Sequence, residues 1–297
     1  MEMRRQQPGE AHPASGRDAR SGVRVAVITG GGTGIGAAVA RRLAAGGDVV
    51  VLAGRRAQPL QEVAGQLGDR ALAITADAAS APDMARVAEA ATARFGGIDT
   101  LVANAGGPGA GTAAGIDDDS WADSLRSNLT TCLVSARACL PQLMRRRGSI
   151  VVISSIAGLA AAPESVGYVA SKHGLIGLAR SMARDYGRHG VRVNTVCPGW
   201  VRTPMADEEM DQLAGLRGLP GRAAAYALAT AHVPLRRPAE PDEIAAVVAF
   251  LASRDASAVT GAVITADCGA TAVDLPTTAF DLPTTAFDPQ TTAFDPP

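Results

Sequence analysis

Short apolar runs alternate with longer stretches of helical periodicity along most of this chain. The apolar runs cover residues 23–29, 49–52, 71–75, 100–103, 149–153, 192–196 and 262–265. The helical stretches include residues 82–95, 120–146, 168–186 and 241–251. Strands that alternate with helices are joined by right-handed crossovers, which produce a parallel sheet covered by helices on both faces. The sequence therefore predicts an α/β fold: a single domain with a doubly wound parallel sheet of about seven strands.

The composition supports a folded chain and argues against several kinds of partner. Of the 297 residues, 47% are hydrophobic and 19% charged, so a sizeable core can form. With a net charge of −1, the chain has no excess of basic residues to neutralise a phosphate backbone. An aromatic content of 3% also provides few side chains on which bases could stack, so nucleic-acid binding is not expected. No apolar run reaches membrane-spanning length, no secretory signal is visible, and the four histidines show no metal-ligand grouping. We expect a cytoplasmic protein with no metal, no nucleic acid and no membrane partner.

Two segments break the alternation of strands and helices before the last predicted strand. Residues 1–22 are polar and rich in Gly, Pro and Arg, which predicts a disordered leader. Residues 200–237 are long for a strand-to-helix connection, and they contain helical patterns at 205–216 and 222–232. An insertion at the carboxyl end of a strand is where a substrate lid would lie.

The C-terminal segment, residues 271–297, repeats the sequence TTAFD three times at a spacing of seven residues. Proline in or beside each unit excludes a continuous coiled coil. The pattern favours a low-complexity tail. The alternative is that Phe280, Phe287 and Phe294 dock on a neighbouring subunit.

A glycine-rich segment, TGGGTGIG at residues 29–36, joins the first predicted strand to the first helix. Glycines let the backbone approach a pyrophosphate closely, and the helix N-terminus offers unpaired N–H groups and the positive end of a dipole. A purely structural turn is the alternative, but the position directly after the first strand favours a dinucleotide site in a sheet of Rossmann type. The residues expected to contact the cofactor here are Gly30, Gly32, Thr33, Gly34 and Gly36.

The end of the second predicted strand bears on which dinucleotide binds. NAD binders usually place an acidic residue there to bind the ribose 2′-OH. This strand ends instead in Gly54, Arg55 and Arg56. Guanidinium groups suit a 2′-phosphate, so the sequence favours NADP(H), with NAD(H) as the alternative. On that alternative the two arginines are simply the solvated start of a helix.

Tyr168 and Lys172 are four residues apart in a predicted helix and therefore share one face. A phenol with a pKa of about 10 is a poor base near neutral pH, but a neighbouring ammonium favours the phenolate and lowers that pKa. The tyrosine could then exchange a proton with a substrate oxygen. Lys172 is the only lysine among 28 Lys and Arg residues. Chance survival is one explanation; the other, which the spacing from Tyr168 favours, is that this position needs an ammonium group that a guanidinium cannot replace.

Two hydroxyls, those of Ser154 and Ser155, follow the strand predicted at residues 149–153. The carboxyl end of a parallel strand faces the crevice where ligands bind, so a serine there could hold a carbonyl oxygen. The alternative is a turn in which the hydroxyl closes the strand.

With these motifs the chain resembles the short-chain dehydrogenase/reductase family. The motifs follow the family's order: TGGGTGIG at 29–36, NAG at 104–106, Asn128 in SNLTT, Ser155 in VVISSIAG, YVASK at 168–172, and PG at 198–199 before Val201 and Thr203. The resemblance covers roughly residues 23–270. It implies a catalytic domain over that range and an oxidoreductase that interconverts a ketone and a secondary alcohol by hydride transfer.

The resemblance assigns a role to each residue of the catalytic motifs. Tyr168 would be the general acid/base, and Lys172 would lower its pKa and bind the nicotinamide ribose. Ser155, thirteen positions before the tyrosine, would polarise the substrate carbonyl, with Ser154 as the less favoured partner. Asn128 would interrupt its helix and hold a water that links Lys172 to solvent.

Contacts with the cofactor are implied in the same way. Asn104 would stabilise the strand behind the cofactor, and Asp77 with Ala78 would meet the adenine amino group. The other residues expected to line the cofactor are Ile35, Ala105, Gly106, Pro198, Gly199, Val201 and Thr203. Thr33 stands where many NADP-preferring members carry a basic residue, which keeps NAD(H) open.

The substrate is less constrained than the chemistry. The apolar residues of the predicted lid favour a hydrophobic small-molecule carbonyl; they are Met205, Met210, Leu213, Leu216 and Leu219. A β-ketoacyl thioester reductase is the alternative, because arginines near the lid could receive an acidic carrier; they are Arg202, Arg217, Arg222, Arg236 and Arg237. A non-catalytic dinucleotide sensor is a second alternative, against which the intact catalytic motifs argue. The resemblance also implies a homotetramer or homodimer.

Overall fold

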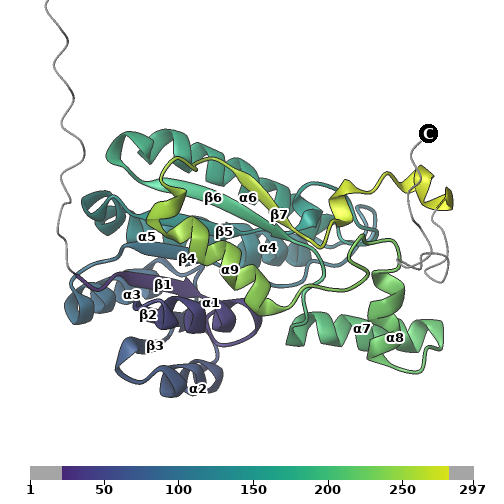
Figure 1. Ribbon diagram of the computed structural model, residues 1–297, viewed down its shortest axis with the longest axis horizontal. Coiled ribbons are helices and arrows are strands. Elements are labelled where there is room, and N and C mark those ends of the chain that lie inside the picture. Colours follow the sequence, from purple (N-terminus) through teal and green to yellow (C-terminus); the bar gives the residue numbers. More distant parts are fainter. Residues whose placement is uncertain (1–21, 281–297) are drawn as a thin grey trace, which may run out of the picture.

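Residues 22–280 are described by the computed structural model, and they form one sheet of seven parallel strands between two layers of helices (Figure 1). The strands are β1 (Val25–Thr29), β2 (Val49–Gly54), β3 (Ala71–Thr75), β4 (Thr100–Ala103), β5 (Ser149–Ile153), β6 (Arg192–Pro198) and β7 (Val263–Ala266). The predicted Rossmann-type fold is thereby confirmed. Residues 1–21 of the predicted leader, and the second and third TTAFD units, lie outside the described residues.

The strands are ordered β3-β2-β1-β4-β5-β6-β7 across the sheet. The chain adds strands outward from β1 to β3, then returns to the centre and adds β4 to β7 on the other side. A crevice therefore opens where β1 and β4 end side by side, because their connections leave in opposite directions. In sheets of this kind ligands bind at that point.

Each face of the sheet has its own apolar core, because side chains alternate along every strand. Val25 and Val27 of β1 face one core, together with α3 (Ala81–Phe95), α5 (Thr131–Arg146) and α6 (Val166–Tyr186). Ala26 and Ile28 face the other core, which is covered by α1 (Gly34–Ala45), α2 (Ala57–Leu67) and α9 (Pro241–Ala252). All residues of β1 and β5 are buried, which explains why these strands are apolar except for Thr29 and Ser149 and do not alternate.

The single helix predicted over residues 120–146 is divided into three parts. It consists of α4 (Asp118–Leu125), a π-helical segment (Arg126–Thr130) and α5. The start agrees with the acidic run in the sequence, because the Asp117 side chain caps α4 by accepting a hydrogen bond from the Ser120 backbone N–H at 2.6 Å. The π-helical segment carries Asn128. Short π-helical turns inserted in an α-helix often occur at functional sites.

Two helices project beyond the sheet at one end of the molecule, α7 (Pro204–Arg217) and α8 (Arg222–Ala229) (Figure 1). Both were predicted, although α8 is shorter than the pattern at residues 222–232. They form a small core of their own around Met210 and Tyr226. Among residues 22–280, no helix has both the length and the apolar character needed to cross a bilayer.

Candidate active site

In the turn between β1 and α1, the start of the helix at Gly36 lies against the backbone of Gly30. Gly30 in turn lies against Asn104 and Ala105, which follow β4. A Cβ at Gly36 would overlap the carbonyl oxygen of Gly30, so only glycine fits in the first turn of α1. Gly30 has a φ of +67°, and a Cβ there would lie 2.8 Å from Nδ2 of Asn104. The loop therefore presents backbone, rather than side chains, to the crevice.

The N-terminus of α1 is open to an anion. Thr33 precedes the helix, and its side chain makes no capping hydrogen bond. The first turn of the helix contains no acidic residue. Unpaired N–H groups and the positive end of the helix dipole therefore meet the bare glycine backbone. This arrangement fits the pyrophosphate of a dinucleotide.

Replacement of Gly36 by alanine tests this fit. We expect Gly36→Ala to weaken NADPH binding by at least tenfold, because the new methyl group would displace the loop from the phosphates by overlapping the Gly30 carbonyl. Gly65→Ala is a matched control, since a Cβ at this position of α2 meets no atom within 4 Å. Fluorescence titration with NADPH measures both affinities. Unchanged affinity in Gly36→Ala would show that the loop does not hold the phosphates.

Asn104 fastens the end of β4 to the end of β1. Its Nδ2 donates to the carbonyl oxygens of Thr29 at 3.0 Å and Gly30 at 3.2 Å. The backbone N–H groups of Asn104 and Ala105 both donate to Oγ1 of Thr29, at 3.0 and 3.1 Å. These bonds hold the two strand ends together beneath the glycine-rich loop.

The end of β2 presents a small residue followed by two exposed cations. A Cβ at Gly54 would meet only the side chain of Leu60, at 3.5 Å or more, so a larger residue fits there. Nη2 of Arg56 donates to Oγ1 of Thr33 at 3.4 Å. The guanidinium of Arg56 therefore leans towards the glycine-rich loop, while Arg55 stays exposed.

Asp77, which follows β3 next to the buried Ala78, is engaged by groups of this chain. Its Oδ1 accepts a hydrogen bond from the Ala79 N–H at 2.9 Å, and its Oδ2 accepts one from Nη2 of Arg126 at 2.7 Å. Arg126 belongs to the π-helical segment that carries Asn128. This ion pair was not predicted from the sequence. Asp77 and Arg126 are 49 positions apart, and Arg126 belongs to none of the sequence motifs.

The first two turns of α6 bring Tyr168 and Lys172 together, as their spacing predicts. Nζ of Lys172 lies 5.2 Å from the centre of the Tyr168 ring. The same ammonium donates to the carbonyl oxygen of Ile153, at the end of β5, at 3.4 Å. Lys172 is almost fully buried, with 5% of its surface exposed. A buried ammonium thus lies between the tyrosine and the edge of the sheet.

The two serines after β5 have different surroundings. Ser154 is buried, and its hydroxyl donates to the carbonyl oxygen of Lys172 at 2.9 Å, so it ties β5 to α6. Ser155 is partly exposed, and its Oγ accepts a hydrogen bond from the Ala157 N–H at 3.1 Å. The side chain of Ser155 also acts on the Tyr168 phenol, whose pKa it lowers. Ser155 is therefore the serine that faces the tyrosine.

Asn128 is buried in the π-helical segment beside Lys172. Its Oδ1 accepts a hydrogen bond from the Gly107 N–H at 3.2 Å, and its Nδ2 donates to the Ser124 carbonyl oxygen at 3.0 Å. A Cβ at Gly106 would lie 3.0 Å from Oδ1 of Asn128 and 3.6 Å from Nζ of Lys172. The glycine of the NAG motif thus leaves the space in which the asparagine and the lysine approach each other.

Burial sets the protonation of the tyrosine–lysine pair. Loss of solvation raises the pKa of the Tyr168 phenol above 10.0; the side chain of Ser155 opposes this rise and the charge of Glu209 adds to it. Burial lowers the pKa of Lys172 to about 8. Desolvation thus outweighs the Ser155 hydroxyl in setting the pKa of the phenol. The expected effect of Lys172 on that pKa stays a prediction.

The chain leaves β6 at Pro198 and Gly199 and enters the lid. Val201 is buried, and Thr203 caps α7 with its side chain. The methyl group of Thr203 lies 3.0 Å from the position that a Cβ on Gly34 would take. The start of α7 therefore rests against the glycine-rich loop. Ile35, beside it, packs on the core between the sheet and α1.

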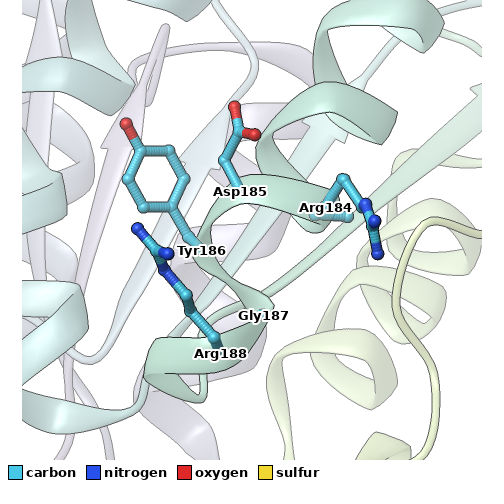
Figure 2. A pocket seen from close by; sticks show the side chains of 6 residues that line it. Arg184, Asp185, Tyr186, Gly187 and Arg188 are labelled. Carbon is cyan, nitrogen blue, oxygen red and sulfur yellow. The ribbon is translucent and has the colours of Figure 1, made fainter.

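The hollow in Figure 2 is a different place on the same helix. It is lined by residues 183–188 at the C-terminal end of α6, where the side chains of Tyr186 and Arg188 lie on one side and that of Arg184 on the other. Tyr168 lies about 25 Å away along the helix, at 1.5 Å per residue. This hollow is therefore not part of the tyrosine–lysine site.

Comparisons with known proteins agree with this geometry. A family model described as enoyl-(acyl carrier protein) reductase matches residues 30–271. The chain is 46% identical over 258 residues to protein MoaE of Klebsiella aerogenes, an alignment that covers 85% of this chain and 97% of the relative. It is 36% identical over 252 residues to meso-2,3-butanediol dehydrogenase of Serratia marcescens, covering 84% and 96%.

A solved structure of an actinorhodin polyketide ketoreductase variant with NADPH is similar to this one, with a TM-score of 0.79 at 34% identity, and covers 83% of this chain and 97% of that one. The shared fold and the matches over most of the chain agree with the order of the sequence motifs. The chain thus belongs to the short-chain dehydrogenase/reductase family and is a nicotinamide-dependent oxidoreductase that interconverts ketones and secondary alcohols.

Proposed function

We propose that Tyr168, Lys172, Ser155 and Asn128 form the catalytic set, and that the reacting carbonyl lies between the phenol of Tyr168 and the hydroxyl of Ser155. One observation carries the proposal: three separate elements deliver these side chains to a single point. Helix α6 supplies the tyrosine and the lysine, the turn after β5 supplies the serine, and the π-helical segment supplies the asparagine. This point lies at the carboxyl ends of β4 and β5, next to the glycine-rich loop.

The proposed mechanism in the direction of reduction follows from these positions. When bound, the nicotinamide supplies the hydride to the carbonyl carbon. Tyr168 is protonated at neutral pH because its pKa is raised, so it can donate a proton to the carbonyl oxygen. Ser155 donates a hydrogen bond to the same oxygen, where negative charge develops. Lys172 places a positive charge beside the phenolate that remains.

We further propose that NADP(H) is the preferred cofactor. Arg55 and Arg56 follow β2 with no carboxylate beside them, and Arg56 leans towards the loop at which the pyrophosphate would lie. Guanidinium groups bind a 2′-phosphate well, whereas an acidic residue at the end of β2 would bind a free 2′-OH. The actinorhodin ketoreductase variant was solved with NADPH, which agrees with this preference.

A carboxylate at the end of β2 should reverse that preference. We expect Gly54→Asp to shift the ratio of kcat/KM for NADPH over NADH by about a hundredfold towards NADH, because the acid repels the 2′-phosphate and accepts from the 2′-OH. The substitution is sterically allowed, since a Cβ at Gly54 makes only ordinary contacts with Leu60. Gly54→Asn is the neutral control. An unchanged ratio would remove β2 from the cofactor assignment.

The lid favours a small apolar carbonyl as substrate. Met205 and Leu216 are exposed on α7, whereas Met210 is buried against α8 and belongs to the lid's own core. The arginines that a carrier-bound thioester would use are largely paired: Arg202 with Glu240, Arg222 with Asp207 and Asp211, and Arg237 with Glu243. Such pairing leaves less free positive charge for an acidic carrier than the sequence indicates. A free ketone is therefore our first candidate.

We also propose that the protein is a cytoplasmic homo-oligomer, a dimer or a tetramer. A shallow groove lies between α5 and α6, and its apolar lining includes Leu133, Leu140, Leu178 and Met182. Leu133 of α5 is exposed. A second copy of this chain would cover that groove.

Steady-state kinetics tests the proposed function. Ketones, diketones and acyl thioesters are offered with NADPH and with NADH, and the absorbance of the reduced nicotinamide is followed. Turnover of free ketones with NADPH supports the proposal. Faster turnover of carrier-bound thioesters would favour the β-ketoacyl reductase, and cofactor binding without turnover of any carbonyl would favour the sensor.

A further inference from the structure

The ion pair between Asp77 and Arg126 joins two parts of the sheet that lie far apart in the sequence. Oδ2 of Asp77 accepts a hydrogen bond from Nη2 of Arg126 at 2.7 Å. Asp77 follows β3, whereas Arg126 follows α4 in the connection from β4 to β5. The strand order β3-β2-β1-β4 separates these two strand ends by β2 and β1. The pair therefore links the two halves of the sheet beside the crevice between β1 and β4.

Both residues of the pair lie on the face of the sheet opposite to α1. Asp77 precedes α3 and Arg126 precedes α5, and these two helices pack against each other on that face. The glycine-rich loop leads into α1, which covers the other face. A dinucleotide with its pyrophosphate at the N-terminus of α1 would therefore have the Asp77–Arg126 pair along its other side.

Asp77 lies next to the end of β2, where we propose that the 2′-phosphate binds. The N–H of Ala76 donates to the carbonyl oxygen of Gly54 at 2.9 Å, so the two strands stay paired up to the residue before Asp77. The N–H of Asp77 donates to Oδ2 of Asp83 at 2.8 Å, and its Oδ1 accepts from the Ala79 N–H at 2.9 Å. The adenosine half of the cofactor would thus lie beside a carboxylate that a tight turn holds in place.

Arg126 extends from a segment that is held to the end of β4. It lies two residues before Asn128 in the π-helical segment, and Oδ1 of Asn128 accepts from the Gly107 N–H at 3.2 Å. The hydroxyl of Thr131, the first residue of α5, donates to the carbonyl oxygen of Ala105 at 3.3 Å. Both acceptor and donor sites of this contact follow β4. The guanidinium therefore reaches Asp77 from a base that is itself fixed to the sheet.

We propose that Arg126 is a positioning residue of the cofactor site: by holding Asp77, it retains the adenosine half of the bound dinucleotide. The inference rests on the proposed cofactor site at the glycine-rich loop. In the protein without cofactor the pair is partly exposed, at 52% of the arginine and 30% of the aspartate side chain, so it adds little to stability. A bound adenosine would shield the pair from water and strengthen it. Arg126 thus slows cofactor release and leaves hydride transfer unaffected.

The rate of cofactor release tests the proposal. Bound NADPH is displaced by an excess of NADP⁺ in a stopped-flow instrument, and the loss of nicotinamide fluorescence is followed. We expect Arg126→Gln to raise the dissociation rate constant about fivefold, as the loss of one partly screened ion pair predicts, with little change in the association rate constant. An unchanged dissociation rate would overturn the proposal.

Arg86→Gln is the matched control. Arg86 pairs with Asp83 at 3.0 Å, and the exposed fractions of these side chains, 55% and 32%, are close to those of the proposed pair. Both of its residues belong to α3, so this pair does not join the two halves of the sheet. The control should release NADPH at the rate of the unaltered protein. An equal rise in both variants would contradict the role of Arg126.

A double-mutant cycle shows whether Arg126 acts through Asp77. The double variant Asp77→Asn with Arg126→Gln should release NADPH no faster than Asp77→Asn alone, because both substitutions break the same pair. Independent, multiplied effects of the two substitutions would mean that Arg126 acts on the cofactor without Asp77, and the proposal would be wrong.

Fragments of the cofactor separate positioning from a general disturbance of the fold. Arg126→Gln should bind 2′-phospho-ADP-ribose about fivefold more weakly than the unaltered protein does, whereas reduced nicotinamide mononucleotide, which lacks adenosine, should bind equally well to both. Equal weakening for the two fragments would show that the substitution acts through the fold. If the unaltered protein binds NADPH and Arg126 has no effect on release, only this inference fails; if the unaltered protein binds no NADPH, the proposed function fails with it.

Discussion

Tyr168→Phe is expected to lower the kcat of carbonyl reduction by about 10³-fold or more while NADPH binding stays nearly intact. The substitution removes a single oxygen, the one that would give its proton to the substrate. The ring remains in place beside Nζ of Lys172, and the phosphate site at α1 is untouched. Single-turnover kinetics and a fluorescence titration with NADPH measure the two quantities separately.

Tyr186→Phe is the control, because this tyrosine lies at the far end of the same helix. It should retain full activity. If Tyr168→Phe still reduced ketones at a comparable rate, the proton would come from another group, and the assignment of the catalytic set would be wrong.

Lys172→Met is expected to abolish turnover and to stabilise the protein without cofactor. Burial of the ammonium lowers the pKa of Lys172 from 10.5 to about 8, and such a shift corresponds to about 3 kcal/mol of lost stability at neutral pH. An apolar side chain of similar length avoids that cost and should raise the Tm by several degrees. Differential scanning calorimetry at pH 7 measures the gain.

The pH dependence of that gain gives a check on its cause. Below pH 8 the lysine is charged in both the folded and the unfolded chain, so the full cost of burial is present. Between pH 8 and 10.5 the folded chain has lost the proton while the unfolded chain still holds it, so stability rises with pH. The advantage of Lys172→Met should therefore shrink over this interval. A constant advantage, or none at pH 7, would show that the buried charge is not the cause.

The strands of this fold are predictable because both of their faces are buried. β3, β4 and β5 begin and end where their apolar runs do. β2 and β6 run two residues further than predicted, since Gly54 and Pro198 extend the backbone pairing without adding to the apolar pattern. The length over which two strands pair depends on the neighbouring strand, which lies elsewhere in the sequence.

Residues of the candidate site were predictable where spacing alone brings them together. Tyr168 and Lys172 meet because they are one helical turn apart, and Ser155 faces them because it ends a parallel strand. The sign of the phenol's pKa shift was not predictable, because desolvation depends on the packing of α6 against the sheet.

Transfer of deuterium from the cofactor tests the central claim most directly. The enzyme is given a ketone and NADPH that carries two deuterium atoms at the nicotinamide C4, and the alcohol formed is analysed by mass spectrometry. The account predicts one deuterium on the carbinol carbon, with the hydroxyl proton drawn from solvent through Tyr168. Alcohol without deuterium on that carbon would contradict hydride transfer at this site.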